Sequence, residues 1–378
     1  MQECRICREP LGPAELTVST PSVTSLSTAL DCDTAVYVCA NCAHAQSPDL
    51  PDLKAFYDTE YKISLHTDGH DQLYETANGR DVFRTDHQAK LALATNPPKG
   101  AKVLDFGCGK AVTLQKMLAG RDDLVPHVFD VSRDYLEHWS QWIPKDNQST
   151  YELPDRWQGY FDLIAAHFVF EHIADPVGVL RDLSRHLAPQ GKLLFIVPNP
   201  VANSGDLLVV DHVNHFSTTS VEELARQCGL DIIVHDTDSF RGGHVVVFSQ
   251  AADTAPAPRP NAASDHAELT SLCAFWGNAI TKIGNAGAGW SGKSVGIYGA
   301  GFYGSIIRQR LAGDPACFLD ANPHVHGRDH LGVPVLAPQD MPDDLDVLIC
   351  CLNPAIARSV VQPDAEWMRG TPQIVYLD

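Results

Sequence analysis

The chain has 378 residues, enough for two domains and a small third, and a formal net charge of −19. Lys and Arg bind nucleic-acid phosphates, so this charge excludes general nucleic-acid binding but allows one nucleotide held by backbone amides. No apolar run reaches the roughly 18 residues of a membrane span, and "MQECRICREP" lacks the pattern of a secretory signal. We therefore expect a cytoplasmic protein with no nucleic-acid or membrane partner.

Two CxxC pairs open the chain, Cys4 with Cys7 and Cys39 with Cys42. Two such pairs are typical of a tetrahedral thiolate zinc site, and four protein ligands leave no position for water. The stretch between them is rich in Thr, Ser and Val, which favours short strands. We predict a zinc ribbon over residues 1–52 with structural zinc; the alternative is four reduced, unligated thiols. Cys32 has no CxxC partner and is interpreted as a bystander.

Strand-like and helix-like segments alternate through residues 53–250. The apolar runs are 102–107, 127–132, 160–167, 192–199 and 244–250, and "PVGVLRDLSRHLAPQG" has helical spacing that ends at Gly191. Strands that alternate with helices predict a mostly parallel, doubly wound sheet of the α/β class.

An Ala-, Pro- and Ser-rich segment over residues 251–268 predicts a linker. Helical spacing follows over residues 265–287, and four further strand candidates stand at 294–301, 316–323, 345–353 and 373–378. We expect a second, smaller Rossmann-like domain over residues 265–378.

The first glycine-rich turn is "VLDFGCGKAV", in which a strand ends at Asp105 and Gly107 and Gly109 follow. An acid directly before the glycines repels phosphate and suits a cationic or hydroxyl-bearing ligand instead. The next strand ends at Asp130, where a carboxylate is placed to accept both ribose hydroxyls. The alternative is that either Asp only caps a helix.

These residues, with "FDLIAAHFVFEHIADPVGVLRDLSRHLAPQGKLLFIVPNP", resemble the class I S-adenosylmethionine-dependent methyltransferases. The resemblance implies that the first loop lines the methionine end of the cofactor and that the second acid binds its ribose. The sulfonium is already a strong electrophile, so such an enzyme need only align an in-line displacement and deprotonate the nucleophile where necessary. The cofactor residues assigned in this way are Asp105, Gly107, Cys108, Gly109, Asp130, Val131, His167 and Phe168.

The order of segments along nearly the whole chain is similar to the zinc-binding sugar C-methyltransferases of deoxysugar pathways. That resemblance implies methylation of the carbon beside the keto group of a nucleotide-linked ketosugar, with a base to remove its proton and a donor to steady the enolate. It places Tyr61 in a substrate-covering segment, as a donor to the keto or enolate oxygen. Where the family has a Tyr-x-Glu-His segment this chain has Val209, Asp211 and His212, and Arg241-Gly242-Gly243-His244 stands for the family's His-Gly-Gly-Ser.

The segment "VVDHVNHFS" is informative without the resemblance. A His of near-neutral pKa is a natural proton acceptor, and a neighbouring carboxylate can orient it. We predict His212 as the general base with Asp211 beside it, and His172, which follows Glu171, as the second candidate. A zinc ligand and plain polar packing are the other roles open to the histidines of this segment.

The second glycine-rich loop, "GIYGAGFYGS", has the dinucleotide fingerprint in spacing and context. It contains Gly299, Gly301 and Gly304, and Asp320 follows about twenty residues later. We interpret it as holding the substrate's nucleotide; degenerate scaffolding and a genuine dinucleotide site are the alternatives. The predicted activity is thus C-methylation of a nucleotide-linked ketosugar or similar small molecule. O- or N-methylation of a small molecule or glycan, and a non-catalytic nucleotide-binding protein, are the other readings.

Overall fold

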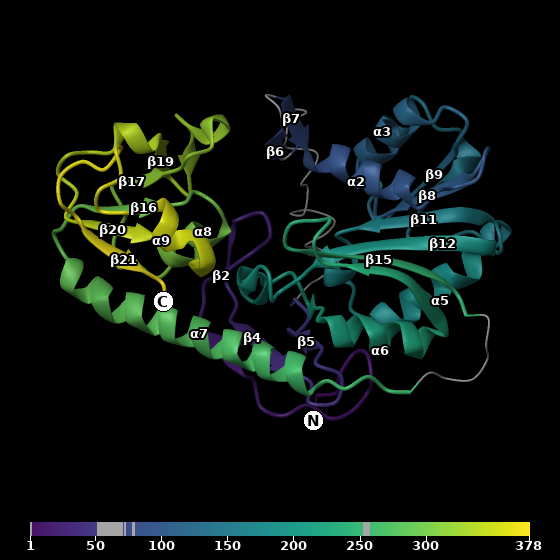
Figure 1. The fold of residues 1–378 in the computed structure, drawn as a ribbon, viewed down its shortest axis with the longest axis horizontal. Coiled ribbons are helices and arrows are strands. Elements are labelled where there is room, and N and C mark those ends of the chain that lie inside the picture. Colours follow the sequence, from purple (N-terminus) through teal and green to yellow (C-terminus); the bar gives the residue numbers. More distant parts are fainter. Residues whose placement is uncertain (1, 51–70, 72, 78–79, 252–257) are drawn as a thin grey trace. The chain divides into compact units, whose positions relative to one another are not determined.

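The computed structural model describes residues 2–50, 71, 73–77, 80–251 and 258–378 (Figure 1). Contacts divide the chain into two compact units, each assembled from separate stretches of sequence. The first unit comprises Met1–Leu11, Cys39–Ala202 and Val213–His266. The second comprises Gly12–Val38, Asn203–His212 and Ala267–Asp378. The boundaries 1–52, 53–250 and 265–378 remain a prediction of domain organisation.

The first unit is built on a seven-stranded sheet of order β10-β9-β8-β11-β12-β15-β14. The five strands from β10 to β12 run parallel, and β15 is antiparallel to both of its neighbours. The strands are β8 Lys102–Phe106, β9 Val125–Asp130, β10 Gln148–Thr150, β11 Phe161–His167, β12 Leu187–Pro198, β14 Leu230–Asp236 and β15 Gly243–Gln250. All five predicted strands of this region are confirmed, and β10 and β14 are additional.

Helices cover both faces of this sheet, as the alternating pattern predicts. In Figure 1, α2 and α3 lie on one side of it and α5 and α6 on the other. Side chains of α2 and α3 join the strands in one buried cluster around Leu114, Met117 and Trp139. The helices are α2 Arg84–Ala94, α3 Val112–Gly120, α4 Leu136–Trp139, α5 Pro176–His186 and α6 Thr218–Cys228. Two small strand pairs also belong to the described part of this unit: β5 Ala45–Gln46 with β13 Asn214–His215, and β6 Leu73–Ala77 with β7 Arg80–Phe83.

The prediction that the helix beginning at Pro176 extends to Gly191 is wrong at its C-terminal end. Helix α5 ends at His186, and Leu187 is already extended and begins β12. Pro189 has no backbone N–H, and the residue before a proline is driven out of the helical region. The prolyl ring therefore ends the helix one turn earlier than the hydrophobic period suggests.

The second unit is built on a six-stranded sheet of order β18-β19-β17-β16-β20-β21, parallel except for β18. The first strand of this sheet in chain order, β16, lies between β17 and β20, as β8 lies between β9 and β11 in the other sheet. The strands are β16 Val295–Tyr298, β17 Cys317–Leu319, β18 Asp329–His330, β19 Val333–Leu336, β20 Val347–Cys350 and β21 Gln373–Tyr376. The helices are α7 Ala263–Gly287, α8 Phe302–Arg308 and α9 Pro354–Val360.

The N-terminal strands of the second unit are short, as the Thr- and Val-rich sequence predicts. They are β1 Leu16–Val18, β2 Ser22–Val23, β3 Ala29–Leu30 and β4 Thr34–Val38, and they pair as β1 with β4 and β2 with β3. Among the helices described for either unit, none combines the length and the apolar composition needed to cross a bilayer.

Candidate active site and metal cluster

The carboxyl edge of the seven-stranded sheet brings together the acids predicted to bind the cofactor. Strand β8 lies between β9 and β11, so the strand order reverses there, and ligands of such sheets bind at this switch point. Asp105 is the penultimate residue of β8, which continues one residue beyond the predicted end, and its side chain is buried; His167 ends β11. Their closest atoms, Asp105 Oδ1 and His167 Nδ1, are 3.8 Å apart, too far for a hydrogen bond.

His167 carries the clearest sign of a polar ligand at this edge. Both of its ring nitrogens are buried, and neither has a hydrogen-bond partner among the described residues. Buried side-chain nitrogens are almost always hydrogen-bonded, because leaving one unpaired costs about 1–3 kcal/mol. Asp105 and His167 therefore suit a small polar group that both donates and accepts hydrogen bonds.

Asp130 ends the neighbouring strand β9 and closes the glycine-rich loop. Its Oδ2 accepts from the Gly109 amide at 2.9 Å and its Oδ1 from the Ser132 amide at 3.0 Å. Burial, with a smaller contribution from Asp105, raises the pKa of Asp130. Each carboxylate oxygen has two acceptor directions, so both retain capacity for a ligand hydroxyl.

The loop between these acids requires its first glycine. Gly107 has a φ of +71°, and a Cβ placed on it would lie 2.5 Å from a methyl carbon of Val169. A hydrogen bond from the buried Trp139 also holds the loop: its indole N–H donates to the Gly109 carbonyl at 2.7 Å. Burial, together with the two acids, raises the pKa of the Cys108 thiol well above its usual value, so this Cys stays neutral.

The remaining predicted cofactor residues offer apolar surface near the same edge. Val131 follows Asp130 and is 48% exposed, which is unusual for a Val next to a sheet. Phe168 has a φ of +57°, and the Arg84 guanidinium lies 3.8 Å from the centre of its ring.

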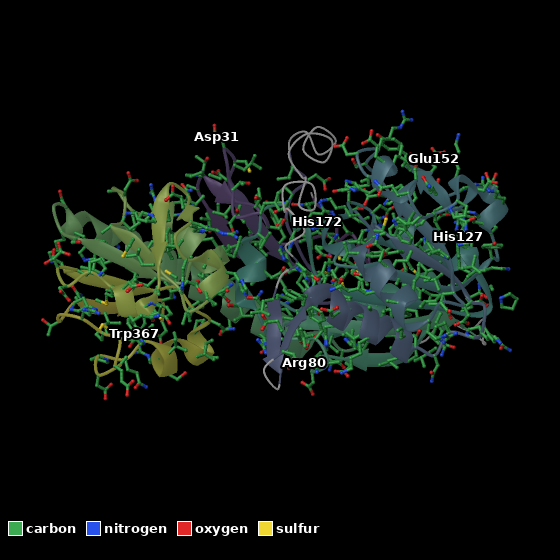
Figure 2. The ribbon with its side chains drawn as sticks, turned by 90° about the horizontal axis from the view of Figure 1, so that it is seen from above. Asp31, Arg80, His127, Glu152, His172 and Trp367 are labelled. Carbon is green, nitrogen blue, oxygen red and sulfur yellow. The ribbon has the colours of Figure 1, made fainter. Side chains whose placement is uncertain are left out.

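His127 in β9, labelled in Figure 2, is not one of the predicted cofactor residues. Burial lowers its pKa to about 4, and its ring packs edge-on against Trp157.

The four N-terminal cysteines converge in the first unit. Their Sγ atoms all lie within 4.8 Å of one another, with Cys4–Cys42 at 3.6 Å and Cys7–Cys39 at 3.5 Å. A tetrahedron with Zn–S bonds of about 2.3 Å has S–S edges of about 3.8 Å, so the cluster is compatible with zinc. Cys32 is not a member of it.

The two CxxC turns have the same backbone geometry. The Arg8 amide donates to the Cys4 carbonyl at 3.0 Å, and the Ala43 amide donates to the Cys39 carbonyl at 2.9 Å. Arg8 and Ala43, each directly after the second Cys of its pair, have positive φ values of 63° and 51°. Two matching turns thus present four thiols to one point, as the spacing predicts.

His212 lies in the second unit with a buried acid on its ring. Its Nδ1 lies 2.6 Å from Oδ1 of Asp206, whose side chain is 1% exposed. The adjacent acid, Asp211, accepts from the Ser25 amide at 2.7 Å and the Ser25 hydroxyl at 2.6 Å. The carboxylate bonded to the His212 ring is thus six residues earlier in the chain, where no local sequence signal marked it.

The other histidines of the predicted motifs lie in the first unit. His172, labelled in Figure 2, ends a short 3₁₀ turn, Phe170–His172, which the Asn214 amide braces by donating to the Phe170 carbonyl at 2.9 Å. His215 is buried in β13, with Nε2 3.1 Å from the Ser47 hydroxyl. His244 is buried in β15, bonded to His235 and to the Phe216 carbonyl. Tyr61 lies outside the described residues.

The second loop repeats the geometry of the first. It follows β16, and Asp320 follows β17. Asp320 Oδ2 accepts from the Ala300 amide at 2.8 Å, and its Oδ1 accepts from the amide two residues further on, at Asn322. A Cβ on Gly304 would lie 2.0 Å from the Gly299 carbonyl oxygen, whereas one on Gly301 would have no described atom within 4 Å. Gly304 is thus needed for packing, and Gly301 leaves the backbone open to approach.

Comparisons with known proteins found a similarity for the part of the chain that contains the first loop. Residues 80–235, which contain β8 to β11 and both acids of the first loop, match the family model described as a methyltransferase domain. The first loop thus lies in a part of the chain that is similar to methyltransferase domains. The match supports the predicted S-adenosylmethionine-dependent enzyme class and the Rossmann-like α/β fold for this part of the chain.

Proteins similar to this part of the chain include two that are named ubiquinone biosynthesis O-methyltransferase. The one from Xanthomonas oryzae pv. oryzae is 32% identical over 127 residues, which are 32% of this chain and 51% of the relative. The one from Thiobacillus denitrificans is 26% identical over 155 residues, which are 36% of this chain and 66% of the relative. The chain thus spans about half the length of the first of these relatives.

Solved structures resemble the chain over a similar extent. A complex of the Haloferax volcanii Trm112 methyltransferase activator with a putative methyltransferase matches with 20% identity and a TM-score of 0.38, over 44% of this chain and 91% of that one. Mitomycin 7-O-methyltransferase matches with 19% identity and a TM-score of 0.37, over 44% of this chain and 54% of that one. At these values the likeness supports no conclusion about substrate or partner.

Proposed function

We propose that the chain transfers a methyl group from S-adenosylmethionine to a small molecule, and that the edge of β8, β9 and β11 holds the cofactor. The observation that carries this proposal is the pair of buried acids beside the His167 ring, whose nitrogens have no hydrogen-bond partner within the described part of the chain. These residues lie in the segment that matches the methyltransferase model. Asp105 and His167 would hold the ammonium and carboxylate of the methionine end, and Asp130 the ribose hydroxyls. The exposed Val131 would pack on the adenine. The cofactor supplies a methyl group already activated on sulfur.

Asp130→Ala is expected to weaken S-adenosylmethionine binding by about one to two decades. A hydrogen bond to a charged group contributes about 1.5–3 kcal/mol, and the variant removes the acceptor for two hydroxyls. Calorimetry measures the affinity, and Asp123→Ala is the control, because Asp123 pairs with Arg121 elsewhere in the same unit. Unchanged affinity in Asp130→Ala would mean that the ribose is held by other groups.

We propose further that the acceptor is a carbon acid beside a ketone, in a nucleotide-linked sugar or similar molecule, and that His212 removes its proton. Transfer to carbon requires a positioned base, because such a proton is lost reluctantly at neutral pH. The buried Asp206 on the His212 ring supports this role, since a His held by a carboxylate is a common arrangement for a general base.

O-methylation is the second candidate, and the names of the two relatives favour it. A hydroxyl acceptor also benefits from a base but involves no carbon–hydrogen bond. The deciding experiment is mass spectrometry of a panel of ketosugar nucleotides and phenols incubated with isotope-labelled S-adenosylmethionine. A methyl group found on carbon would support the first candidate, and one found on oxygen would replace it with the second.

The second loop is proposed to hold the nucleotide of the substrate. Gly301→Val is expected to lower nucleoside diphosphate affinity by about one to two decades, because the side chain blocks hydrogen bonds from the loop amides to phosphate. The backbone of Gly301 is extended and its Cβ direction is open, so the fold should tolerate the change. Gly313→Val, at another open and exposed glycine of this unit, is the matched control.

Calorimetry with a set of nucleoside diphosphates and with NAD reads out this prediction. S-adenosylmethionine affinity should be the same in Gly301→Val and in the parent. Equal diphosphate affinities in the two proteins would favour a scaffolding loop, and tight NAD binding that Gly301→Val abolishes would favour a dinucleotide site.

A further inference from the structure

The contact between Asp206 and His212 joins two residues that the chain brings together by local folding. Asp206 lies in the 3₁₀ segment η5, Ser204–Leu208. The Val209 amide donates to the Asp206 carbonyl at 3.0 Å, and the His212 amide donates to the Val209 carbonyl at 3.0 Å. Two successive turns therefore return the imidazole to the carboxylate six residues before it.

The second unit fixes this segment from three of its elements. From α7, the buried Trp276 donates its indole N–H to the Ser204 carbonyl at 2.8 Å. From α8, the Tyr303 hydroxyl accepts from the Gly205 amide at 3.1 Å. From β2, the Val23 carbonyl accepts from the Val210 amide at 3.0 Å. Asp206 is thus held on a supported backbone, as a group that orients another side chain must be.

We propose that Asp206 is the positioning residue of His212, which rests on the proposed role of His212 as the base. An ionised carboxylate only accepts hydrogen bonds, so Nδ1 of His212 must carry the proton that it donates to Asp206. The lone pair of the neutral ring then stands on Nε2. In the reaction, Nε2 takes the proton of the acceptor carbon, the electrons of that C–H bond pass to the enolate, and Asp206 stabilises the imidazolium that forms.

This tautomer can be measured without a substrate, by nitrogen NMR of the full chain labelled with ¹⁵N-histidine. The His212 signals are assigned by their loss in His212→Asn. In the parent we expect a protonated Nδ1 and an unprotonated Nε2 when the ring is neutral. Asp206→Asn should give a mixture of the two tautomers, because an amide can donate to Nδ1 as well as accept from it. A parent His212 protonated at Nε2 and bare at Nδ1 would overturn the proposal.

Kinetics with the acceptor found by the labelled-cofactor panel test the consequence. Asp206→Asn should lower kcat by about 10²-fold or more with KM nearly unchanged, since binding contacts remain while the reactive tautomer is depleted. The acid limb of its rate profile should move to lower pH, because the imidazolium loses its stabilising charge. Asp343→Asn, which removes a largely exposed carboxylate of the same unit, is the control and should match the parent.

Different results would contradict the role of Asp206 as a positioning residue and the role of His212 as the base. Parent-like turnover and pH profile in Asp206→Asn, alongside an inactive His212→Asn, would overturn the positioning role alone. Full turnover in His212→Asn would overturn the base assignment and the positioning role with it.

Discussion

Replacing His212 with Asn is expected to lower turnover by about 10²–10⁴-fold, the usual contribution of a general base, while S-adenosylmethionine affinity stays the same. Asn is preferred to Ala because its amide can still donate a hydrogen bond to the buried carboxylate of Asp206. His324→Asn, at an exposed position of the same unit, is the control and should keep parental turnover.

Deuterium exchange separates carbon from heteroatom acceptors in the same experiment. With the demethylated cofactor in place of S-adenosylmethionine, the parent should wash solvent deuterium into the α-position of a ketone substrate, and His212→Asn should not. Exchange that persists in the variant would move the base to His172 or His215. A parent that shows no exchange and places methyl on oxygen would replace the C-methylation proposal with O-methylation.

Replacing Cys39 with Ser is expected to release zinc and unfold the N-terminal part of the chain. Structural zinc binds small peptides with an apparent free energy of about 10–16 kcal/mol, comparable to the whole stability of a domain at about 5–15 kcal/mol. A Ser hydroxyl is not a thiolate, so one ligand is lost from a buried four-sulfur cluster. The parent should carry about one zinc per chain, and the variant close to none.

Metal analysis by mass spectrometry and a thermal melt give the two readouts. Cys32→Ser removes a thiol that lies between the two CxxC pairs in the sequence but outside the cluster, and it should keep both the zinc and the melting temperature. Soluble, folded parent protein without zinc would contradict the prediction and leave the four cysteines as unligated thiols.

Features encoded in short stretches were predictable from the sequence. The CxxC spacing identified all four members of the thiol cluster, because each pair lies on one turn. The acids near the ends of β8 and β9 were found because an apolar run marks each strand, and the acid is its last residue in β9 and its last but one in β8. The three-residue β10, with the polar sequence QST, carries no such signal and was missed.

Features that depend on contacts between distant or irregular segments were not predictable. Asp206 was not predicted, because Asp211 is the acid next to His212 in the sequence, whereas two irregular turns bring the earlier acid to the ring. The division of the chain into units assembled from separate stretches has no signature in composition or periodicity, since it arises from tertiary packing. Which side chains surround His212 could therefore be learned only from the structure.

The assembly of the second unit from three separate stretches limits how this protein can be recombined. Gly12–Val38 and Asn203–His212 pack with residues after Ala267, for example where Arg310 donates to the carbonyls of Ser19 and Pro21. In a chimera that takes only its C-terminal third from a relative, the relative's residues would replace Trp276 and Tyr303. These two side chains hydrogen-bond the backbone of the segment that carries His212. A chimera should therefore fold only when all three stretches come from the same parent protein. We expect recombination in the laboratory to yield folded proteins mainly when these stretches are exchanged together.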